Sequence, residues 1–405
     1  MLYELHEFQR TITAPLVAWM DASHRLFTSP YSPLAYTPVS RHVAASSELL
    51  KRLMRSYHKP EWGIKHALVG DREVPVTIER VMDKPFCHLL HFRKEMDHPG
   101  RRVLIFAPLS GHHATLLRDT VRTMLQDFDV YITDWVDARM IPLTEGPFHL
   151  DDYVGYVQEF IRHLGPGLAT VSVCQPTVPV LAGISLLAQA QDPCVPAAVV
   201  MMGGPIDPRR NPTVVNDFAM GRPHSWFADK VIYRVPYNYP GFLRRVYPGF
   251  LQHLSFIAMN ADRHMEAHRD FFNHLIVGDG DSAEAHRRFY DEYNAVLDMP
   301  AEYYLDTIKT VFQDFALPRG TWEVRGTLVQ PQAIKTAALF TIEGELDDIS
   351  GHGQTEAAHT LCRSIPSEMR KHLLAKGVGH YGIFSGRKYR ETIYPQLRDF
   401  VRRWS

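Results

Sequence analysis

The sequence is poor in the residues that build metal sites and disulfide frameworks. Only four of its 405 residues are cysteine, with no CxxC pair and no adjacent histidine pattern. This spacing argues against a zinc site and against disulfide staples, so we expect free thiols in a reducing compartment, with no metal and no cofactor. The cysteines are Cys87, Cys174, Cys194 and Cys362.

An excess of charge of one sign is also missing. The chain has 44 lysine and arginine residues against 45 aspartate and glutamate residues. Such a balance gives no broad electric field that would attract a polyanion or an anionic membrane surface. We therefore expect no nucleic-acid partner.

Long apolar runs are absent too. The amino-terminal MLYELHEFQRTITAPLVAWM is interrupted by charged and polar residues where a secretion signal needs an unbroken apolar run. No later stretch approaches the ~20 apolar residues of a membrane-spanning helix. These absences predict a cytoplasmic protein without a membrane span.

What is present is an alternation of strand-like and helix-like segments, which predicts an α/β fold. An antiparallel pair of strands is expected over 73–93. Helix-like segments follow at 114–126, 151–164, 177–190, 354–364 and the carboxyl terminus, and strand-like segments lie at 103–108, 129–135, 169–173, 197–202, 338–344 and 370–375. Nearly continuous apolar strands that alternate with helices predict a mostly parallel sheet covered by helices on both faces.

This alternation divides the chain into three parts. Residues 1–70 predict a helical extension, whose role the pattern does not indicate. Residues 71–204 and 337–405 form the expected core. Residues 205–336, rich in aromatics and histidine, interrupt the pattern and predict a helical cap over the carboxyl ends of the strands, where open α/β sheets bind ligands. The alternative is a separate domain.

Cys174 is the candidate nucleophile. It lies in VSVCQP at 171–176, where an apolar strand ends and a helix begins. A nucleophile elbow of the form GxSxG presents its side chain at such a turn, and here Ser172 and Pro176 replace the glycines. Helix N–H groups and a neighbouring imidazolium favour a thiolate there. The alternative is that Cys174 is an ordinary small core residue.

His380 and Asp347 are the candidate partners of Cys174. The strand ending at Gly344 leads into Glu345-Leu346-Asp347-Asp348, and the next leads into GVGHYG at 377–382. Nucleophile, acid and histidine thus follow in the order of an α/β-hydrolase. We expect His380 to act as base and acid, and Asp347, in a G-x-x-D turn, to orient it. Asp348 is the alternative, with the other of the two capping a helix.

Two backbone N–H groups are expected to form an oxyanion hole. One should belong to Gln175, directly after the nucleophile. The second should come from the loop at 108–113, and its position favours Ser110. A plain polar connection is the alternative for this loop.

Three segments, VCQPTVPVLAGISLLA, IEGELDDISG and GVGHYGIFSG, together with the amino-terminal MLYELHEFQR, resemble the intracellular poly(3-hydroxybutyrate) depolymerases. The resemblance runs over nearly the whole chain. It implies an α/β-hydrolase with a helical cap that acts on polyester granules or oligomeric 3-hydroxybutyrate in the cytoplasm. It places the family's cysteine, aspartate and histidine triad on Cys174, Asp347 and His380.

A more distant resemblance links the chain to the polyhydroxyalkanoate synthases, which typically have glycines after the cysteine where this chain has Gln175-Pro176-Thr177. That difference favours degradation over synthesis. A synthase-like acyltransferase, a small-ester or thioester hydrolase, and a granule-coating protein without activity are the rival interpretations. Tyr237, Tyr239 and Phe242 are candidate polymer contacts, with cap core as the alternative. The sequence does not indicate the oligomeric state.

Overall fold

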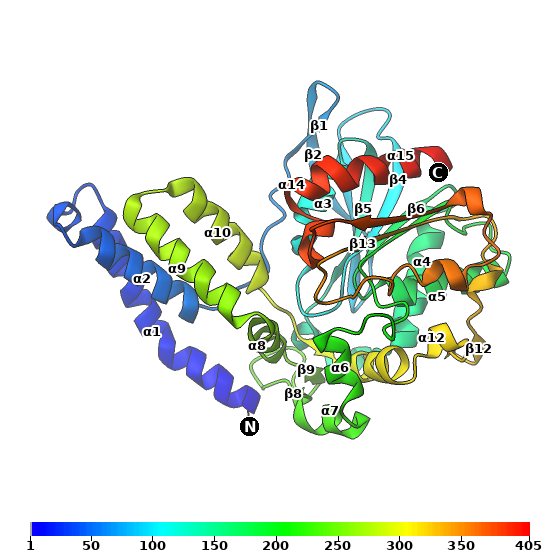
Figure 1. Cartoon of the computed structure of the whole chain (residues 1–405). Helices are drawn as coiled ribbons and strands as arrows, with labels where there is room; N and C mark the ends of the chain where they lie inside the picture. The colour runs from blue at the N-terminus through cyan, green and yellow to red at the C-terminus, as the bar shows by residue number, and fades with distance from the viewer. Residues whose placement is uncertain (1) are drawn as a thin grey trace.

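The structure, a computed structural model, describes residues 2–405. Figure 1 shows two parts, a sheet with helices on both faces and an arm built only of helices. The arm combines the amino-terminal segment, in blue, with part of the 205–336 insertion, in yellow-green. Within the described residues no helix is long and apolar enough to cross a membrane.

The central sheet has the strand order β1-β2-β3-β5-β4-β6-β7-β13-β14. The pairs from β5 through β4 to β14 are all parallel, whereas β1, β2, β3 and β5 pair antiparallel. The strands are β1 (His66–Val69), β2 (Arg72–Asp83), β3 (Cys87–Lys94), β4 (Arg101–Phe106), β5 (Phe128–Trp135), β6 (Ala169–Val173), β7 (Ala198–Met202), β13 (Ala338–Gly344) and β14 (Arg370–Ala375).

Alternate residues of the parallel strands enter two separate cores. In β4, Val103 and Ile105 pack with helices on one face of the sheet, and Leu104 and Phe106 pack with helices on the other. This follows from the two-residue period of a strand and explains why the strands are apolar throughout. The covering helices are α3 (Arg118–Met124) and α15 (Tyr394–Trp404) on the first face, and α4 (Leu150–Leu164) and α5 (Thr177–Gln189) on the second.

The helix expected over 354–364 is reduced to the short α13 (Ala358–Leu361). Residues 352–357 form turns in its place. Glu343, buried at the end of β13, accepts hydrogen bonds from the N–H groups of Gly353, Thr355 and Glu356 at 2.6–2.9 Å, which fixes this segment to the sheet. The strand expected at 370–375 is β14, and the short α14 (Gly386–Lys388) precedes α15.

The insertion is split between the core and the arm. Its core-side elements are α6 (Val214–Met220), α7 (His224–Lys230), α11 (Ala301–Thr307), α12 (Ala316–Arg319), the small sheet of β8 (Tyr233–Arg234), β9 (Arg245–Tyr247) and β10 (Met299–Pro300), and the hairpin of β11 (Glu323–Val324) and β12 (Thr327–Leu328). Its arm-side elements are α8 (Gly249–Met259), α9 (Ala261–Val277) and α10 (Gly280–Tyr293), which join α1 (Leu2–Thr28) and α2 (Ser40–Met54). Parts of the segments 1–70 and 205–336, namely α1 and α2 of the first and α8, α9 and α10 of the second, therefore share one structural unit.

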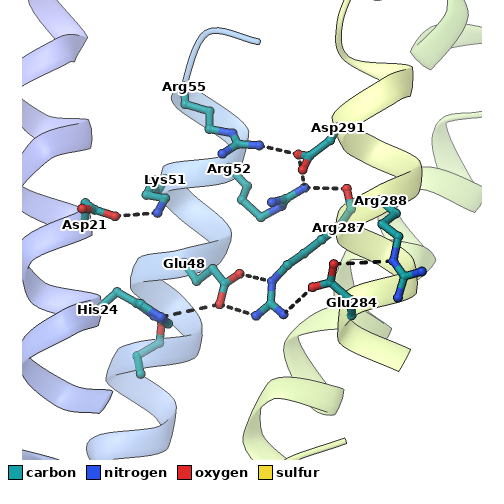
Figure 2. A network of polar contacts seen from close by, with 11 residues as sticks. Asp21, His24, Glu48, Lys51, Arg52, Arg55, Glu284, Arg287, Arg288 and Asp291 are labelled. Atoms are coloured by element: carbon teal, nitrogen blue, oxygen red, sulfur yellow. Dashed lines mark hydrogen bonds and ion pairs between the residues drawn. The ribbon is translucent and has the colours of Figure 1, made fainter. Parts of the chain in front are cut away.

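Charged side chains hold the arm helices together (Figure 2). Glu48 on α2 is buried and accepts two hydrogen bonds from Arg287 on α10, at 2.6 and 2.9 Å. Lys51 bonds Asp21 on α1 at 2.6 Å, and Arg52 bonds Asp291 on α10 at 2.7 Å. The faces that these helices turn toward one another are thus partly polar.

We expect the Glu48–Arg287 pair to stabilise the arm at neutral pH and to lose this effect in acid. Burial by itself would raise the pKa of Glu48, but the hydrogen bonds and charge of Arg287 outweigh it and lower the pKa. A carboxyl whose pKa is lowered adds stability above its unfolded pKa, about 4.3. That stability disappears as the pH falls through the folded pKa.

Glu48→Gln should therefore reduce the protection of α2 and α10 amides against hydrogen exchange at pH 7, by roughly 1–3 kcal/mol. Near pH 3 the difference from the wild type should be much smaller. Exchange is to be measured at both pH values and corrected for intrinsic rates. Glu266→Gln, an exposed carboxyl on α9, is the matched control. An equal loss at both pH values would contradict the assigned role of Glu48.

Candidate active site

Cys174 directly follows β6, and its backbone has a φ of +67°, in the left-handed region that few residues other than glycine adopt. Its N–H donates to the carbonyl of Met202 at 2.7 Å, which fixes it to the neighbouring β7. Its own carbonyl accepts from the N–H and the hydroxyl of Thr177, at 3.1 and 2.9 Å. These bonds hold a sharp strand-to-helix turn that presents the thiol.

Two glycines at the end of β7 make room for this turn. A Cβ on Gly204 would lie 1.9 Å from Thr177 Oγ1 and 2.5 Å from the carbonyl oxygen of Cys174. Gly203 has a φ of +56°, and its Cβ would lie 2.5 Å from Ile383 Cδ1. In a GxSxG elbow the small residues lie within the motif. Here Gly203 and Gly204, which follow the adjacent strand β7, take that place.

Glu343 acts on the same glycines through the 353–356 loop. Its carboxylate holds Thr355, whose Oγ1 accepts from Gly204 N–H at 2.8 Å and donates to Gly204 C=O at 3.0 Å. Sequence reasoning missed Gly203, Gly204 and Glu343. The two glycines could have been found from the sequence, because they form a pair immediately after the apolar segment 197–202.

Asp347, rather than Asp348, contacts His380. The distance from Asp347 Oδ2 to His380 Nδ1 is 2.8 Å, and both residues are buried. The other oxygen of Asp347 accepts from the N–H groups of Ile349 and Ser350, which fixes the carboxylate. Asp348 is exposed, and its carboxylate accepts from the Asn260 amide at 3.1 Å.

Cys174 lies on the other side of His380 from Asp347. Burial alone would lower the pKa of His380, but the negative charges of Asp347 and Cys174, and hydrogen bonds to both, raise it well above its ordinary value. Because Asp347 occupies Nδ1, the ring nitrogen that faces Cys174 is Nε2. His380 thus lies between the Asp347 carboxylate and Cys174.

The residues chosen for the oxyanion hole lie on two well-fixed segments. Gln175 is buried and follows Cys174 directly. Ser110 lies in a loop that the insertion holds, because Leu297 N–H donates to Gly111 C=O at 2.7 Å and His112 Nε2 lies 3.1 Å from the Tyr293 carbonyl. In the part of the chain that the structure describes, neither the Gln175 nor the Ser110 backbone N–H donates to another protein group.

Gln175 has a second property that sequence reasoning missed. Both polar atoms of its side-chain amide are buried and have no hydrogen-bond partner among the described residues. Such a group costs ~1–3 kcal/mol unless a ligand pairs with it. Both polar atoms of this amide are therefore left without a hydrogen bond from the described residues, directly beside Cys174.

The aromatic candidates Tyr237, Tyr239 and Phe242 lie elsewhere. The hydroxyl of Tyr239 donates to Glu7 on α1 at 2.9 Å, so this residue ties the amino-terminal helix to the insertion. It also lines a cleft of about 820 Å³ that Cys174 and His380 do not line. Tyr237 and Phe242 are exposed, and no contact with the triad is present within residues 2–405. The same residues contain no cluster of metal-binding side chains.

A mostly parallel sheet with helices on both faces, a strained strand-to-helix turn at Cys174 after a central strand, and Asp347 and His380 after the last two strands are the arrangement of an α/β-hydrolase. The profile described as "PHB de-polymerase C-terminus" matches residues 203–405. The chain belongs to this family of polyhydroxybutyrate depolymerases, which supports an ester-hydrolysing enzyme. No curated protein matches the chain.

Several solved structures are similar at low identity. A 2-hydroxy-6-oxo-6-phenylhexa-2,4-dienoate hydrolase from Rhodococcus sp. strain RHA1 is 13% identical, with a TM-score of 0.44 over 81% of this chain and 99% of its own. An esterase from Thermogutta terrifontis is 12% identical, with a TM-score of 0.42 over 82% and 99%. A monoacylglycerol lipase from Paleococcus ferrophilus is 12% identical, with a TM-score of 0.40 over 74% and 93%.

Gly204→Ala should distort the elbow, because the added Cβ meets Thr177 and the Cys174 carbonyl. We expect a stability loss of roughly 1–3 kcal/mol and a changed rate of alkylation at Cys174. Thermal unfolding and mass spectrometry of iodoacetamide-treated protein measure the two effects. Gly280→Ala is the control, because a Cβ there meets nothing within 4 Å. Wild-type values for both properties in Gly204→Ala would contradict this account of the elbow.

Proposed function

We propose that this protein hydrolyses ester bonds through an acyl-cysteine formed on Cys174. One arrangement carries the proposal, namely a strained elbow that places Cys174 beside His380, which the buried Asp347 orients at 2.8 Å. A nucleophile, a base and an orienting group in this sequence of contacts are what covalent acyl transfer needs.

In the first half-reaction, His380 takes the thiol proton and the sulfur attacks the ester carbonyl carbon. The carbonyl electron pair moves onto oxygen, where the N–H groups of Gln175 and Ser110 bind the negative charge. When the tetrahedral intermediate collapses, the C–O bond to the leaving alcohol breaks. His380 donates its proton to that oxygen, and the acyl group stays on Cys174.

In the second half-reaction, water takes the place of the alcohol. His380 removes a proton as the water oxygen attacks the acyl carbon, and the same N–H groups bind the oxyanion. Collapse breaks the C–S bond and releases a carboxylic acid. The sulfur leaves as a thiolate, so the catalyst is restored once protons re-equilibrate with His380.

For the substrate we propose poly(3-hydroxybutyrate) or its oligomers, cleaved at granules in the cytoplasm. The family profile supports a polyester substrate. The sharpest test is incubation with amorphous poly(3-hydroxybutyrate) granules while the released 3-hydroxybutyrate species are titrated.

Two rival activities use the same three residues. A synthase-like acyltransferase would pass the acyl group to a hydroxyl, and chain growth from a hydroxyacyl thioester would reveal it. A small-ester or thioester hydrolase would cleave a soluble short ester but release nothing from granules. Gln175 and Pro176 after the nucleophile, instead of glycines, favour hydrolysis over synthesis.

Cys174→Ala should abolish ester cleavage while the protein remains folded, because it removes the attacking atom and alanine fits a small elbow position. Cys174→Ser should lose at least a hundredfold in kcat, since a hydroxyl is a far weaker nucleophile than a thiolate in this setting. The measurement is hydrolysis of a soluble short ester and of granules. Cys362 is buried, so its lack of alkylation under the same conditions serves as the control for thiol reactivity. Turnover by Cys174→Ala would refute the mechanism.

Asp347→Asn should lower kcat far more than Asp348→Asn does. The first change breaks the bond that sets the His380 tautomer, and comparable losses elsewhere reach ~10⁴-fold. The second removes only an exposed contact to Asn260. Steady-state kinetics of the two variants on one soluble ester decide between them. The reverse ranking would move the orienting role to Asp348.

A further inference from the structure

The amino-terminal helix α1 carries an apolar stripe that nothing in the described part of the molecule covers. Large side chains recur along it every three or four residues, and each residue retains 41–66% of its accessible surface. A lone exposed leucine needs no explanation, but a row of this length marks an interaction surface. The stripe consists of Leu5, Phe8, Ile12, Leu16, Trp19 and Leu26.

The stripe faces away from the rest of the arm. At about 100° per residue, its members fall within an arc of roughly 80° on the helix. The residues that anchor α1 to its neighbours, Tyr3, Arg10 and Asp21, lie roughly 180° from the centre of that arc. These anchors bond Asp298, Tyr239 and Lys51. In Figure 1, α1 forms the outer edge of the arm, farthest from α9 and α10.

The arm therefore combines partly polar contacts between its helices with an apolar face on its outside. Its helices meet through the charged network of Figure 2, including the buried Glu48, while leucine, isoleucine, phenylalanine and tryptophan side chains point outward. Packing within this chain does not account for the apolar face, because α1 already has its partners on the other side. At the tip of the arm, Tyr31 and Tyr36 extend the exposed apolar surface.

We propose that this stripe docks the enzyme on the surface of its solid polyester substrate. The inference rests on the proposed function and names the surface through which an insoluble, neutral polymer is held. The stripe contains no charged residue, and the charges elsewhere on α1 are nearly balanced, with Glu4, Glu7 and Asp21 against Arg10 and Arg25. An uncharged aliphatic polyester matches such a face, whereas an anionic membrane would require a basic rim.

A second copy of the chain fits the stripe less well. A stable interface takes about 20–30 residues from each partner, more than one helix face provides. A paired helix would also need a regular apolar seam with charged flanks, but Pro15 and Ala22 interrupt the alternate core positions. Most positions beside that seam, such as Gln9, Thr11, Ala18 and Ser23, carry no charge that would select a partner.

The test compares a stripe variant with a matched control. The stripe variant is Phe8→Gln, Ile12→Gln and Trp19→Gln, because glutamine keeps helix propensity. The control changes three exposed apolar residues outside α1, Leu68→Gln, Leu143→Gln and Val214→Gln. Both are made with and without Cys174→Ala, so that binding is measured without turnover. The probe is protein-free amorphous poly(3-hydroxybutyrate) granules, sedimented at low salt and at about 0.5 M salt, a concentration that screens charges within about 5 Å.

We expect the stripe variant to bind granules at least tenfold more weakly than the control, at both salt concentrations. Its hydrolysis of a soluble short ester should stay within twofold of the wild type, because no stripe residue contacts the triad. If soluble-ester turnover is absent from the wild type as well, the proposed function fails, while the binding comparison in the Cys174→Ala background still reports on the stripe.

Three results would overturn the inference. The first is equal granule binding by the stripe and control variants. The second is a halving of molar mass in the stripe variant by light scattering, which would assign the stripe to a second copy of the chain. The third is binding that falls steeply with salt or favours anionic lipid vesicles over granules, which would assign it to a membrane.

Discussion

The backbone of Cys174 is the constraint on which the site depends. A φ of +67° turns the chain from β6 into α5 within a few residues and leaves the thiol at the end of the sheet. That conformation is unfavourable for a residue with a side chain, so it persists only where the surroundings fix it. Here the fixing groups come from outside the elbow: the Met202 carbonyl, Gly203 and Gly204, and behind them Thr355 and Glu343.

The order of chemical groups along the chain can be read from the sequence because each follows the end of a strand. Strand ends in a parallel sheet meet at one edge, so the sequence alone predicts that Cys174, Asp347 and His380 lie near one another. The choice of Asp347 over Asp348 depends on which carboxylate reaches the ring, and adjacent residues on a loop differ in direction in a way that spacing does not reveal. The support from Glu343 is invisible in the sequence for the same reason, because it acts across the fold through hydrogen bonds to backbone groups.

The arm shows a different limit of pattern reasoning. Residues 1–70 predict a helical extension, and the usual expectation for an amphipathic helix places its apolar face inward. In the structure the packing face carries Arg10 and Asp21, and the leucine-rich face lies outward. The hydrophobic period locates a face but does not say what covers it. The partners of α1, which are α2 and the parts of the insertion that carry Tyr239 and Asp298, determine which of its sides is buried.

A short segment after α10 joins the two functional parts of the molecule. Tyr293 and Leu297 hold the 108–113 loop that carries Ser110, and Asp298 accepts a 2.6 Å hydrogen bond from Tyr3 at the start of α1. The helix that carries the apolar stripe is thus connected through residues 293–298 to the loop assigned to the oxyanion hole. Buried hydrogen bonds at both ends make this connection stiff rather than hinged. A polymer held at the proposed stripe would therefore be linked to the proposed oxyanion-hole loop by a segment that is fixed at both ends.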